Sequence, residues 1–493
     1  MNTQKITILP EQVMTNGTNV NNLYVFLSHH KKIATISIPV GSDTEISLTY
    51  ESSWVEEGFA VSPYLPLNGN FDHRAVRNYL QNLLPEGKGL EEITSNTTIS
   101  KNNTFGLIKI IGEETSGALS FRGEGSDAKK TTFREITTDE LGEKLTRFKA
   151  MGESITYWDG RTRLSVAGVQ DKLNLLEVDG KLGFGEGELC SNKIVKFETG
   201  KAPFIAVNEL FTMLLADEAG INVPPVEVRT YGGVRAFVIE RFDRHVVPDN
   251  FRVLRRHVID GCQATNLPPS YKYERQYGDE GDGIYIRDGV SFPKLFAVET
   301  TNSEAYQAQL VRWMTFNILV RNYDAHGKNI SFFVGKKGLE LTPFYDLVNI
   351  EAIIREVQKA QVDGTRAKEN VIPQHYAMSI GEYNTGNAGN FNSPISAYML
   401  ADFADEFKIS LPRMQLLMSQ MIKSVLSTID IAKDKALEQG LSAVEVNHIE
   451  LCIEIIKEAA EEINKEIEDL PSMKEFFACS GRNRSTISVQ SDH

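Results

Sequence analysis

Apolar and polar residues alternate along the first part of the chain, which predicts β-strands there. The runs NNLYVFLSH, KIATISIPV and EISLTY have the two-residue period of half-buried strands and together indicate a small sheet. The segment FDHRAVRNYLQNLLPEG then has helical spacing and ends at Pro-Glu-Gly. TFGLIKIIGEETSGALSF predicts a further helix, a glycine-containing turn and a strand. We therefore expect an N-terminal module at residues 1–125.

A second group of strands follows a charged connector and a helix, SDAKKTTFREITTDELGEKLTRFKAM. The pattern is strand-like in RLSVAGVQDKLNLLEV, KLGFGE and KIVKFE, and it has helical spacing in AVNELFTMLLADEAG. PVEVRTYGGVRAFVIERFD then predicts a hairpin with Gly232 and Gly233 in its turn. These elements predict a sheet-rich lobe at residues 126–245.

The rest of the chain is mostly helical in pattern, and we assign residues 246–470 to a helical lobe. Its last part, LSAVEVNHIELCIEIIKEAAEEINKEI, begins with the capping-box spacing of Ser442 and Glu445. The polar segment 471–493 is predicted to be a tail that is disordered over its last dozen residues. A length of 493 residues is sufficient for two or three domains of this kind.

Composition and charge narrow the classes of function. The net charge of −14 argues against a protein that coats nucleic acid or an anionic membrane unaided, although it does not exclude a local basic patch. The four cysteines are scattered without a C-x-x-C pair, so we expect a reducing cytoplasm and no disulfide framework or structural zinc site. The start of the chain lacks the apolar segment of a secretory signal, and no apolar run is long enough to span a membrane.

One polar run between two apolar segments contains an aspartate, a histidine, a lysine and an asparagine. It is RNYDAHGKNIS, residues 321–331. The apolar spacing before it predicts a helix that ends near Val320, and the pattern after it predicts a hairpin from about Ile330 to Tyr345. Catalytic side chains usually lie on polar loops that are held between rigid elements. This loop is therefore the first candidate for an active site.

Asp324 and Asn329 form the pattern D-x-x-x-x-N, and Asp346 follows seventeen residues after Asn329. Phosphoryl transfer needs one carboxylate that orients or deprotonates the acceptor hydroxyl. It also needs oxygen ligands, here an amide and a second carboxylate, that hold Mg²⁺ on the nucleotide phosphates. The alternative is that Asp324 and Asn329 only cap or turn the loop, because isolated matches of this kind arise by chance. The presence of Asp346 and of the lysine and histidine in the loop favours a phosphoryl-transfer site, but it does not decide between the two interpretations.

Lys196 lies in the middle of the strand-like run KIVKFE, either as a phosphate ligand or as an edge lysine whose amine reaches solvent. Glu209 follows thirteen residues later on the next predicted helix. This separation is the one expected for a strand lysine that pairs with a helix carboxylate, but Glu209 is equally well explained as a solvated helix residue. Both interpretations stay open from the spacing alone.

Two further segments are candidates for nucleotide binding. The loop SVAGVQDK, residues 165–172, has a single glycine, and its backbone amides can face phosphate oxygens. A phosphate added to Ser165 would place negative charge where the nucleotide phosphates must lie, but an ordinary turn serine is the simpler interpretation. The segment AFVIERFDR, residues 236–244, is either a lobe connection that contacts adenine or a plain strand followed by a salt-bridged turn.

As a set, these residues resemble a known family. The segments that carry the resemblance are, in chain order, SVAGVQDKL, IVKFE, NEL, INVPPVEV, VIERFDR, RNYDAHGKNIS and LTPFYDLV. They closely resemble the HipA family of bacterial toxin kinases, and SPYLPLNG, NYLQNLLPEG and IGEETSGALSF agree in the N-terminal part. The resemblance covers roughly residues 22–430, and the combination is far more specific than any single motif.

The resemblance implies a serine/threonine protein kinase with an α+β, two-lobed protein-kinase-like fold, an N-terminal α/β subdomain and a mainly helical C-terminal lobe. It implies ATP and Mg²⁺ as cofactors, with Asp324 as the catalytic base and Asn329 and Asp346 as metal ligands. Ser165 matches the serine that family members autophosphorylate, which ejects the loop and switches the kinase off. By motif, the nucleotide-binding residues are Val166, Ala167, Gly168, Val169, Gln170, Asp171, Lys172, Lys196, Glu240, Arg241, Phe242, His326, Lys328 and Tyr345.

The resemblance also implies partners. The usual partner is a small HipB-like helix-turn-helix antitoxin that carries the complex to operator DNA, and the usual target is an aminoacyl-tRNA synthetase, best known for glutamate. Inhibition of the target stops translation and leads to growth arrest or persistence. The segment EYNTGNAGNFNS has no basic residue where family members can present a lysine-rich loop, so we expect DNA contact only through the antitoxin. Two alternatives stay open: a co-repressor with a vestigial kinase site, and a kinase for a small molecule.

Overall fold

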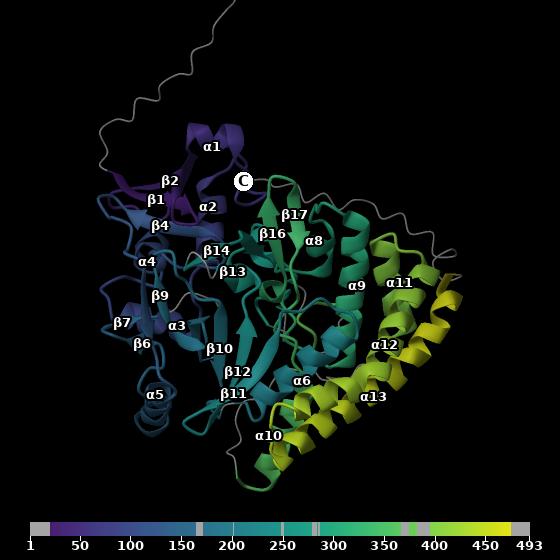
Figure 1. The fold of residues 1–493 in the computed structure, drawn as a ribbon. Coiled ribbons are helices and arrows are strands. Elements are labelled where there is room, and N and C mark those ends of the chain that lie inside the picture. Colours follow the sequence, from purple (N-terminus) through teal and green to yellow (C-terminus); the bar gives the residue numbers. More distant parts are fainter. Residues whose placement is uncertain are drawn as a thin grey trace, which may run out of the picture.

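A computed structural model gives the structure of the chain. It describes residues 20–163, 171–200, 202–247, 251–278, 283, 286–365, 374–381 and 395–474. Most of the predicted phosphate loop, including Ser165, lies outside the described residues, as do the last residues of the predicted tail. Figure 1 shows three parts along the chain: an N-terminal subdomain, a lobe built on a sheet and a lobe of long helices.

The N-terminal subdomain is built around a four-stranded antiparallel sheet with strand order β3-β2-β1-β4. Because β4 pairs with β1, this segment of the chain closes on itself as one unit. Its strands and helices confirm those that the apolar pattern predicts. The strands are β1 (Val20–Leu27), β2 (Lys31–Pro39), β3 (Ser47–Tyr50) and β4 (Leu119–Gly123). The helices are α1 (Ser52–Glu57), α2 (His73–Gln81), α3 (Lys88–Ser95) and α4 (Thr104–Ile111).

The second lobe contains a six-stranded antiparallel sheet with strand order β11-β12-β10-β8-β9-β5. The predicted hairpin is present, and Gly232 and Gly233 both adopt the positive φ that its turn requires. The strands are β5 (Thr132–Glu135), β8 (Lys172–Val178), β9 (Lys181–Glu186), β10 (Lys193–Phe197), β11 (Val226–Tyr231) and β12 (Val234–Glu240). The helices α5 (Thr138–Met151) and α6 (Ile205–Glu218) and the short pair β6 (Tyr157–Trp158) and β7 (Arg161–Thr162) complete the lobe.

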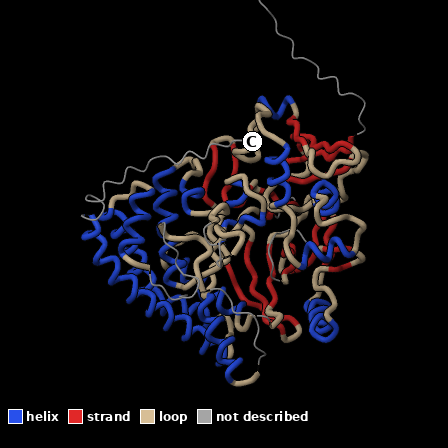
Figure 2. The backbone as a smooth tube through the Cα atoms, turned by 180° about the vertical axis from the view of Figure 1, so that it is seen from behind, coloured by secondary structure: helices blue, strands red, loops and turns tan. Residues whose placement is uncertain are grey.

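Helices dominate the third part, as predicted. The predicted helix end near Val320, the following hairpin and the Ser442–Glu445 capping box are all present. The helices are α7 (Gly261–Ala264), α8 (Phe292–Phe296), α9 (Ser303–Leu319), α10 (Ile350–Val362), α11 (Ala397–Glu406), α12 (Leu411–Leu437) and α13 (Ala443–Asp469), and the hairpin strands are β16 (Ser331–Gly335) and β17 (Gly338–Leu341). Figure 2 shows the long helices of this part on one side of the molecule and most of the strands on the other.

Besides the two-residue strands β6 and β7, the sequence analysis missed four short strands. The predicted charged connector contains β5, which pairs with β9 at the edge of the six-stranded sheet. The lobe predicted to be helical begins with β13 (Arg244–Val247), β14 (Arg252–Arg255) and β15 (Val258–Asp260), and β15 pairs with β16. Each of these strands has three or four residues, which is too short for an apolar alternation to be recognised.

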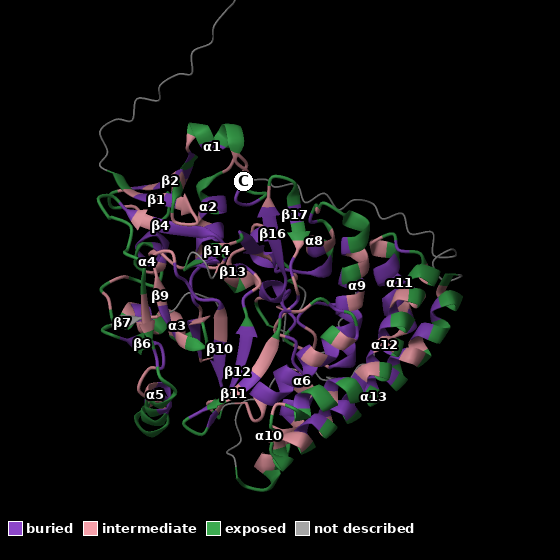
Figure 3. Cartoon of the chain, viewed as in Figure 1, coloured by how far each residue is buried: buried purple, intermediate pink, exposed green. Residues whose placement is uncertain are grey.

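One hydrophobic core joins the N-terminal subdomain to the helical lobe. It runs from Leu23 and Tyr79 in the subdomain to Trp313 of α9 and the inner faces of α12 and α13. Figure 3 shows these inner helix faces buried and their outer faces exposed. A smaller core lies between α5 and the six-stranded sheet. The subdomain is thus packed firmly enough to place its own side chains in a site on the other lobes. In the described part of the chain, no helix is both long and apolar enough to cross a membrane.

Candidate active site

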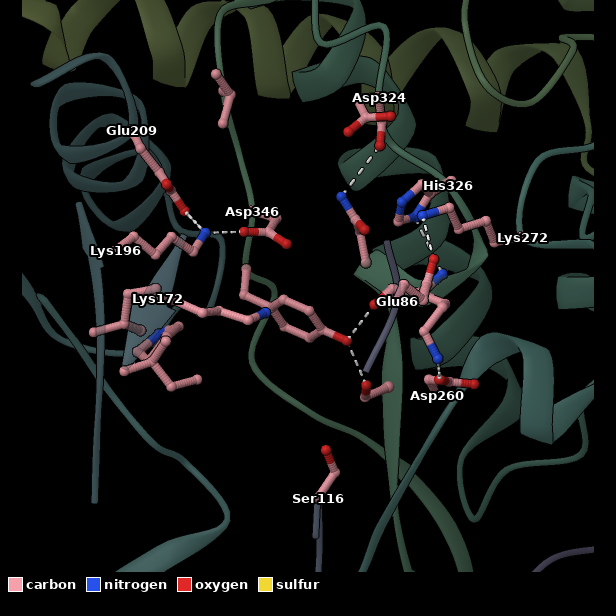
Figure 4. A pocket seen from close by; sticks show the side chains of 18 of the residues that line it. Glu86, Ser116, Lys172, Lys196, Glu209, Asp260, Lys272, Asp324, His326 and Asp346 are labelled. Atoms are coloured by element: carbon pink, nitrogen blue, oxygen red, sulfur yellow. Dashed lines mark hydrogen bonds and ion pairs between the residues drawn. The ribbon is translucent and has the colours of Figure 1, made fainter. Parts of the chain in front are cut away.

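A cavity of about 460 Å³ opens where the three parts of the chain meet. The six-stranded sheet and α6 form one wall, and the loop between α9 and β16 forms another. Asn82, Glu86 and Ser116 of the N-terminal subdomain also line it. Figure 4 shows the charged side chains of all three parts directed toward this space.

Lys196 connects the sheet, α6 and the segment after β17. Its Nζ lies 2.6 Å from Oε1 of Glu209 on α6, and it also forms an ion pair with Oδ1 of Asp346. The spacing-based prediction of a Lys196–Glu209 pair is therefore confirmed, and the alternative of a solvated Glu209 is wrong, since its side chain is 1% exposed. The same lysine holds Asp346 at the cavity, although 150 residues separate the two in sequence.

The charge states in this cluster follow from burial and pairing. Burial raises the pKa of Glu209 to about 8 despite the neighbouring Lys196. Burial also acts to raise the pKa of Asp346, but the Lys196 ammonium outweighs it and holds this pKa well below its ordinary value. Asp346 is therefore the ionised partner of Lys196 near neutral pH, and the Glu209 carboxyl is mostly protonated there. The carboxylate that the sequence assigns to a metal thus keeps its negative charge.

The polar loop holds its two motif residues in one compact turn. The amide nitrogen of Asn329 donates a hydrogen bond to the backbone carbonyl of Asp324 at 3.1 Å, so its amide oxygen points the other way. The backbone N–H of Asp324 donates to the side chain of Asn322 at 3.2 Å. The Asp324 side chain itself is exposed at the cavity. This arrangement leaves a carboxylate for an acceptor and an amide oxygen for a cation.

Of the predicted phosphate loop, Asp171 and Lys172 are described, and residues 165–170 lie outside the described part. Lys172 begins β8 and pairs with Lys196 in the ladder, so both lysines face the cavity. Burial lowers the pKa of Lys172 to about 8. Asp171 accepts a hydrogen bond from the hydroxyl of Thr199 at 3.0 Å. The two lysines lie side by side on adjacent strands and give this wall of the cavity a positive charge that suits nucleotide phosphates.

The predicted adenine-binding segment lies at the end of β12 and lines the cavity. The ring of Phe242 lies 5.7 Å from the ring of Tyr345, which forms an aromatic side to the pocket. The Arg241 side chain is directed elsewhere: it is buried and makes a two-point contact with Asp243. The carboxylate of Glu240 pairs with Lys193 at 3.3 Å. Binding of adenine by residues 240–242 stays a prediction, and it would involve their backbone and the Phe242 ring.

His326 and Lys328 line the same cavity, but each is already engaged by the protein. Burial lowers the pKa of His326, so its ring is neutral and caps the turn by accepting from the backbone N–H of Lys328. The ammonium of Lys328 is buried and pairs with Asp260, and it also donates to the side chain of Asn82 at 3.1 Å. A role of His326 and Lys328 in binding the nucleotide itself stays a prediction.

The sequence analysis missed several residues of the cavity, among them Glu86, Asp260, Lys272 and Tyr273. Glu86 accepts a hydrogen bond from the Lys272 ammonium at 2.8 Å, and Tyr273 donates one to Asp324 at 2.6 Å. The only clue in the sequence was the segment NYLQNLLPEG, whose last acidic residue is Glu86 and which the family resemblance includes.

Comparisons with known proteins support one family. The family model described as the HipA-like C-terminal domain matches residues 164–429, and that of the HipA N-terminal domain matches residues 23–122. The chain belongs to the HipA family. A curated relative, the serine/threonine-protein kinase toxin HipA of Shewanella oneidensis, is 39% identical over 79% of this chain and 84% of its own length.

The fold is also that of a HipA protein. A chain from the Shewanella oneidensis complex of HipA, HipB and operator DNA superposes with a TM-score of 0.78 and 34% identity, over 91% of this chain and 99% of that chain. The predicted family and the kinase-like fold class are therefore confirmed. This HipA-family chain shares its enzyme class, a serine/threonine-protein kinase, with the relative that matches most of its length.

Proposed function

We propose that the chain is the toxin kinase of a toxin–antitoxin module, which transfers the γ-phosphate of ATP to a serine or threonine of a protein. The observation that carries this proposal is the convergence of Lys196, Asp324, Asn329 and Asp346 on one cavity, although they come from separate elements. Phosphoryl transfer depends mainly on positioning and charge stabilisation, so such a convergence is what the reaction requires.

The residues present fit a hard divalent cation. Asn329 uses its amide nitrogen inside the loop and so presents its oxygen, and Asp346 remains ionised with one oxygen on Lys196. Mg²⁺ usually binds through one or two carboxylates, oxygen ligands of this kind and the substrate phosphates. When bound, it would neutralise charge on the phosphates. Asn329 and Asp346 are the residues that would hold it.

The roles of the remaining residues follow from their positions. Asp324 orients the acceptor hydroxyl and accepts its proton. Lys196 binds the nucleotide phosphates, held in place by Glu209, and Lys172 adds a second positive charge on the neighbouring strand. Phe242 and Tyr345 provide the aromatic side for the adenine. A phosphate added to Ser165 would compete with the nucleotide phosphates for these cations, which is why we propose Ser165 as the site of self-inactivation.

The partner proposed for the chain is a HipB-like helix-turn-helix antitoxin. The support is the likeness to a HipA chain that was solved with HipB and operator DNA. We propose that this chain contacts the operator only through the antitoxin, because its net charge is −14. We take an aminoacyl-tRNA synthetase, glutamyl type first, as the target to test, with arrest of translation and growth as the outcome.

The test is incubation of phosphatase-treated protein with Mg-ATP, followed by intact-mass and peptide mass spectrometry. We expect a gain of about 80 Da, one phosphate, at Ser165. Asp324→Asn should abolish the gain and any growth arrest on expression. The matched control is Asp363→Asn at the exposed end of α10, which should behave as the wild type.

Three results would redirect the proposal. Phosphate transfer and growth arrest that persist in Asp324→Asn would show that Asp324 is not the base. A wild-type protein that does not bind Mg-ATP and transfers no phosphate would favour the alternative of a co-repressor with a vestigial kinase site. Phosphorylated small molecules, but no phosphoproteins, in a treated lysate would identify a small-molecule kinase.

A further inference from the structure

The catalytic carboxylate is held by a residue that the proposed mechanism does not use. The phenol hydroxyl of Tyr273 donates a hydrogen bond to Oδ1 of Asp324 at 2.6 Å. Among the residues that the structure describes, no other side chain forms a hydrogen bond or ion pair with this carboxylate. Because Asp324 is exposed at the cavity, its side chain would otherwise be free to turn between rotamers.

The backbone around Tyr273 is fixed at three points. The N–H of Gly327, inside the polar loop, donates to the carbonyl of Lys272 at 2.9 Å. On the other side, the N–H of Glu274 donates to Ala377 at 3.2 Å, and the carbonyl of Glu274 accepts from Gly289 at 3.0 Å. The tyrosine is therefore mounted on a segment that is bonded to the same loop that carries Asp324.

The ring of Tyr273 is also placed by contact. It packs edge-to-face on the ring of His326, two residues after Asp324, with centroids 5.0 Å apart. Such an aromatic pair has a preferred geometry as well as buried area. The backbone hydrogen bonds and the ring contact therefore direct the Tyr273 hydroxyl at the Asp324 carboxylate.

The N-terminal subdomain reinforces this arrangement. Glu86 binds the ammonium of Lys272, the residue next to Tyr273, at 2.8 Å, and both side chains are largely buried, at 18% and 12% exposure. Figure 4 shows Glu86, Lys272, His326 and Asp324 along one side of the pocket. A displacement of the subdomain would therefore be transmitted to Tyr273 through Lys272.

The hydrogen bond from Tyr273 leaves Asp324 able to accept a proton from the acceptor hydroxyl. Burial and the neighbouring Asp324 carboxylate raise the pKa of Tyr273, so the phenol keeps its proton and acts as the donor. A carboxylate has two oxygens, and Tyr273 occupies Oδ1. Oδ2 is left to accept the hydrogen bond of the acceptor hydroxyl.

We infer that Tyr273 is a positioning residue for phosphoryl transfer: it fixes the Asp324 carboxylate so that Oδ2 faces the acceptor hydroxyl. The inference rests on the proposed function and assigns this role to a tyrosine outside the D-x-x-x-x-N loop. Tyr273 does not contact the nucleotide in this account. Its loss should therefore slow the transfer step and leave nucleotide binding unchanged.

The experiment compares the wild type with Tyr273→Phe, which keeps the ring against His326 and removes only the hydroxyl. Self-phosphorylation of phosphatase-treated protein is followed by intact mass over a range of Mg-ATP concentrations. We expect the maximal rate constant of self-phosphorylation at saturating Mg-ATP to fall about tenfold to a hundredfold, the scale of a misplaced catalytic group. The Mg-ATP concentration that gives half of this maximal rate constant and the Kd of a non-hydrolysable Mg-ATP analogue should stay within twofold. Tyr277→Phe, on the same segment and 62% exposed, is the matched control and should match the wild type.

The outcomes separate the inference from the proposed function. A faster Tyr273→Phe would overturn it and identify Tyr273 as a gate that blocks the acceptor. A phosphate found on Tyr273 would overturn it by making this residue an acceptor. An unchanged maximal rate constant, or a loss of nucleotide binding as large as the loss of rate, would overturn it while the kinase assignment stands. A wild-type protein that transfers no phosphate would overturn both.

Discussion

Replacement of Lys196 by methionine tests whether the buried cluster at the cavity depends on one cation. Lys196→Met keeps most of the side-chain length but removes the charge that faces Glu209 and Asp346. The Glu209 side chain is 1% exposed, so it cannot find water in place of the lysine. Asp346 is 40% exposed and can be solvated in part.

The size of the effect follows from these burials. Removing one partner of a buried ion pair costs about 3–5 kcal/mol, because the other charge stays buried. Burial raises the pKa of Glu209 to about 8, so this carboxyl is already mostly protonated near neutral pH, and the loss lies at the lower end of that range. We therefore expect a loss of about 3 kcal/mol, or roughly 6 °C in the unfolding midpoint at about 2 °C per kcal/mol for a large domain.

The assay is thermal unfolding of four proteins in a double-mutant cycle, with Mg-ATP binding measured on each. Lys196→Met combined with Glu209→Leu also removes the buried carboxyl that loses its hydrogen-bond partner in the single variant, and should recover about 2 kcal/mol of the single variant's loss. ATP binding should be lost in every protein without Lys196. Lys193→Met is the matched control on the same strand: it pairs with Glu240, which is 50% exposed, so its loss should stay below about 1 kcal/mol.

Two results would refute this reasoning. If the effects of Lys196→Met and Glu209→Leu simply add, the two side chains do not stabilise each other, and the pair seen in the structure contributes nothing. If Lys196→Met binds Mg-ATP as tightly as Lys193→Met does, the cation does not hold the nucleotide phosphates.

Two further predictions concern other buried charges. Asp243→Asn should lower the unfolding midpoint by several degrees. The buried guanidinium groups of Arg241 and Arg244 would lose their shared carboxylate, at a cost of about 3 kcal/mol or more. A midpoint within about 1 °C of the wild type would contradict this. The second is a pH dependence: burial raises the pKa of Glu209 from 4.5 to about 8, so its contribution to stability is complete below pH 4.5 and is lost as the pH rises through 8. Glu209→Gln cannot lose that proton, and its unfolding midpoint should fall less than that of the wild type between about pH 6 and pH 9. An equal fall in both proteins would count against the assignment.

Local patterns predicted much of the fold because they report short-range physics. The end of α9 near Val320, the β11–β12 hairpin and the capping box of α13 each depend on residues within a few positions of one another. The motif residues of the polar loop were recognisable for the same reason, since Asp324 and Asn329 lie in one turn. The short strands β5 and β13–β15 were missed because each is stabilised by pairing with a partner strand, and that pairing leaves no periodicity in three or four residues.

By itself, the sequence determined the acidic net charge, indicated the order of most elements and singled out the residues that we propose to orient a hydroxyl or bind a cation. Only the tertiary structure decided which of them meet. Glu86 binds Lys272 across 186 residues, and Asn82 binds Lys328 across 246. Such contacts depend on how the N-terminal subdomain packs on the helical lobe, through a core that no local pattern specifies. Contacts within the helical lobe bring Tyr273 to Asp324 across 51 residues, and the subdomain supports them through the Glu86–Lys272 pair. Together they turn a recognisable loop into a site whose proposed catalytic carboxylate is held in place.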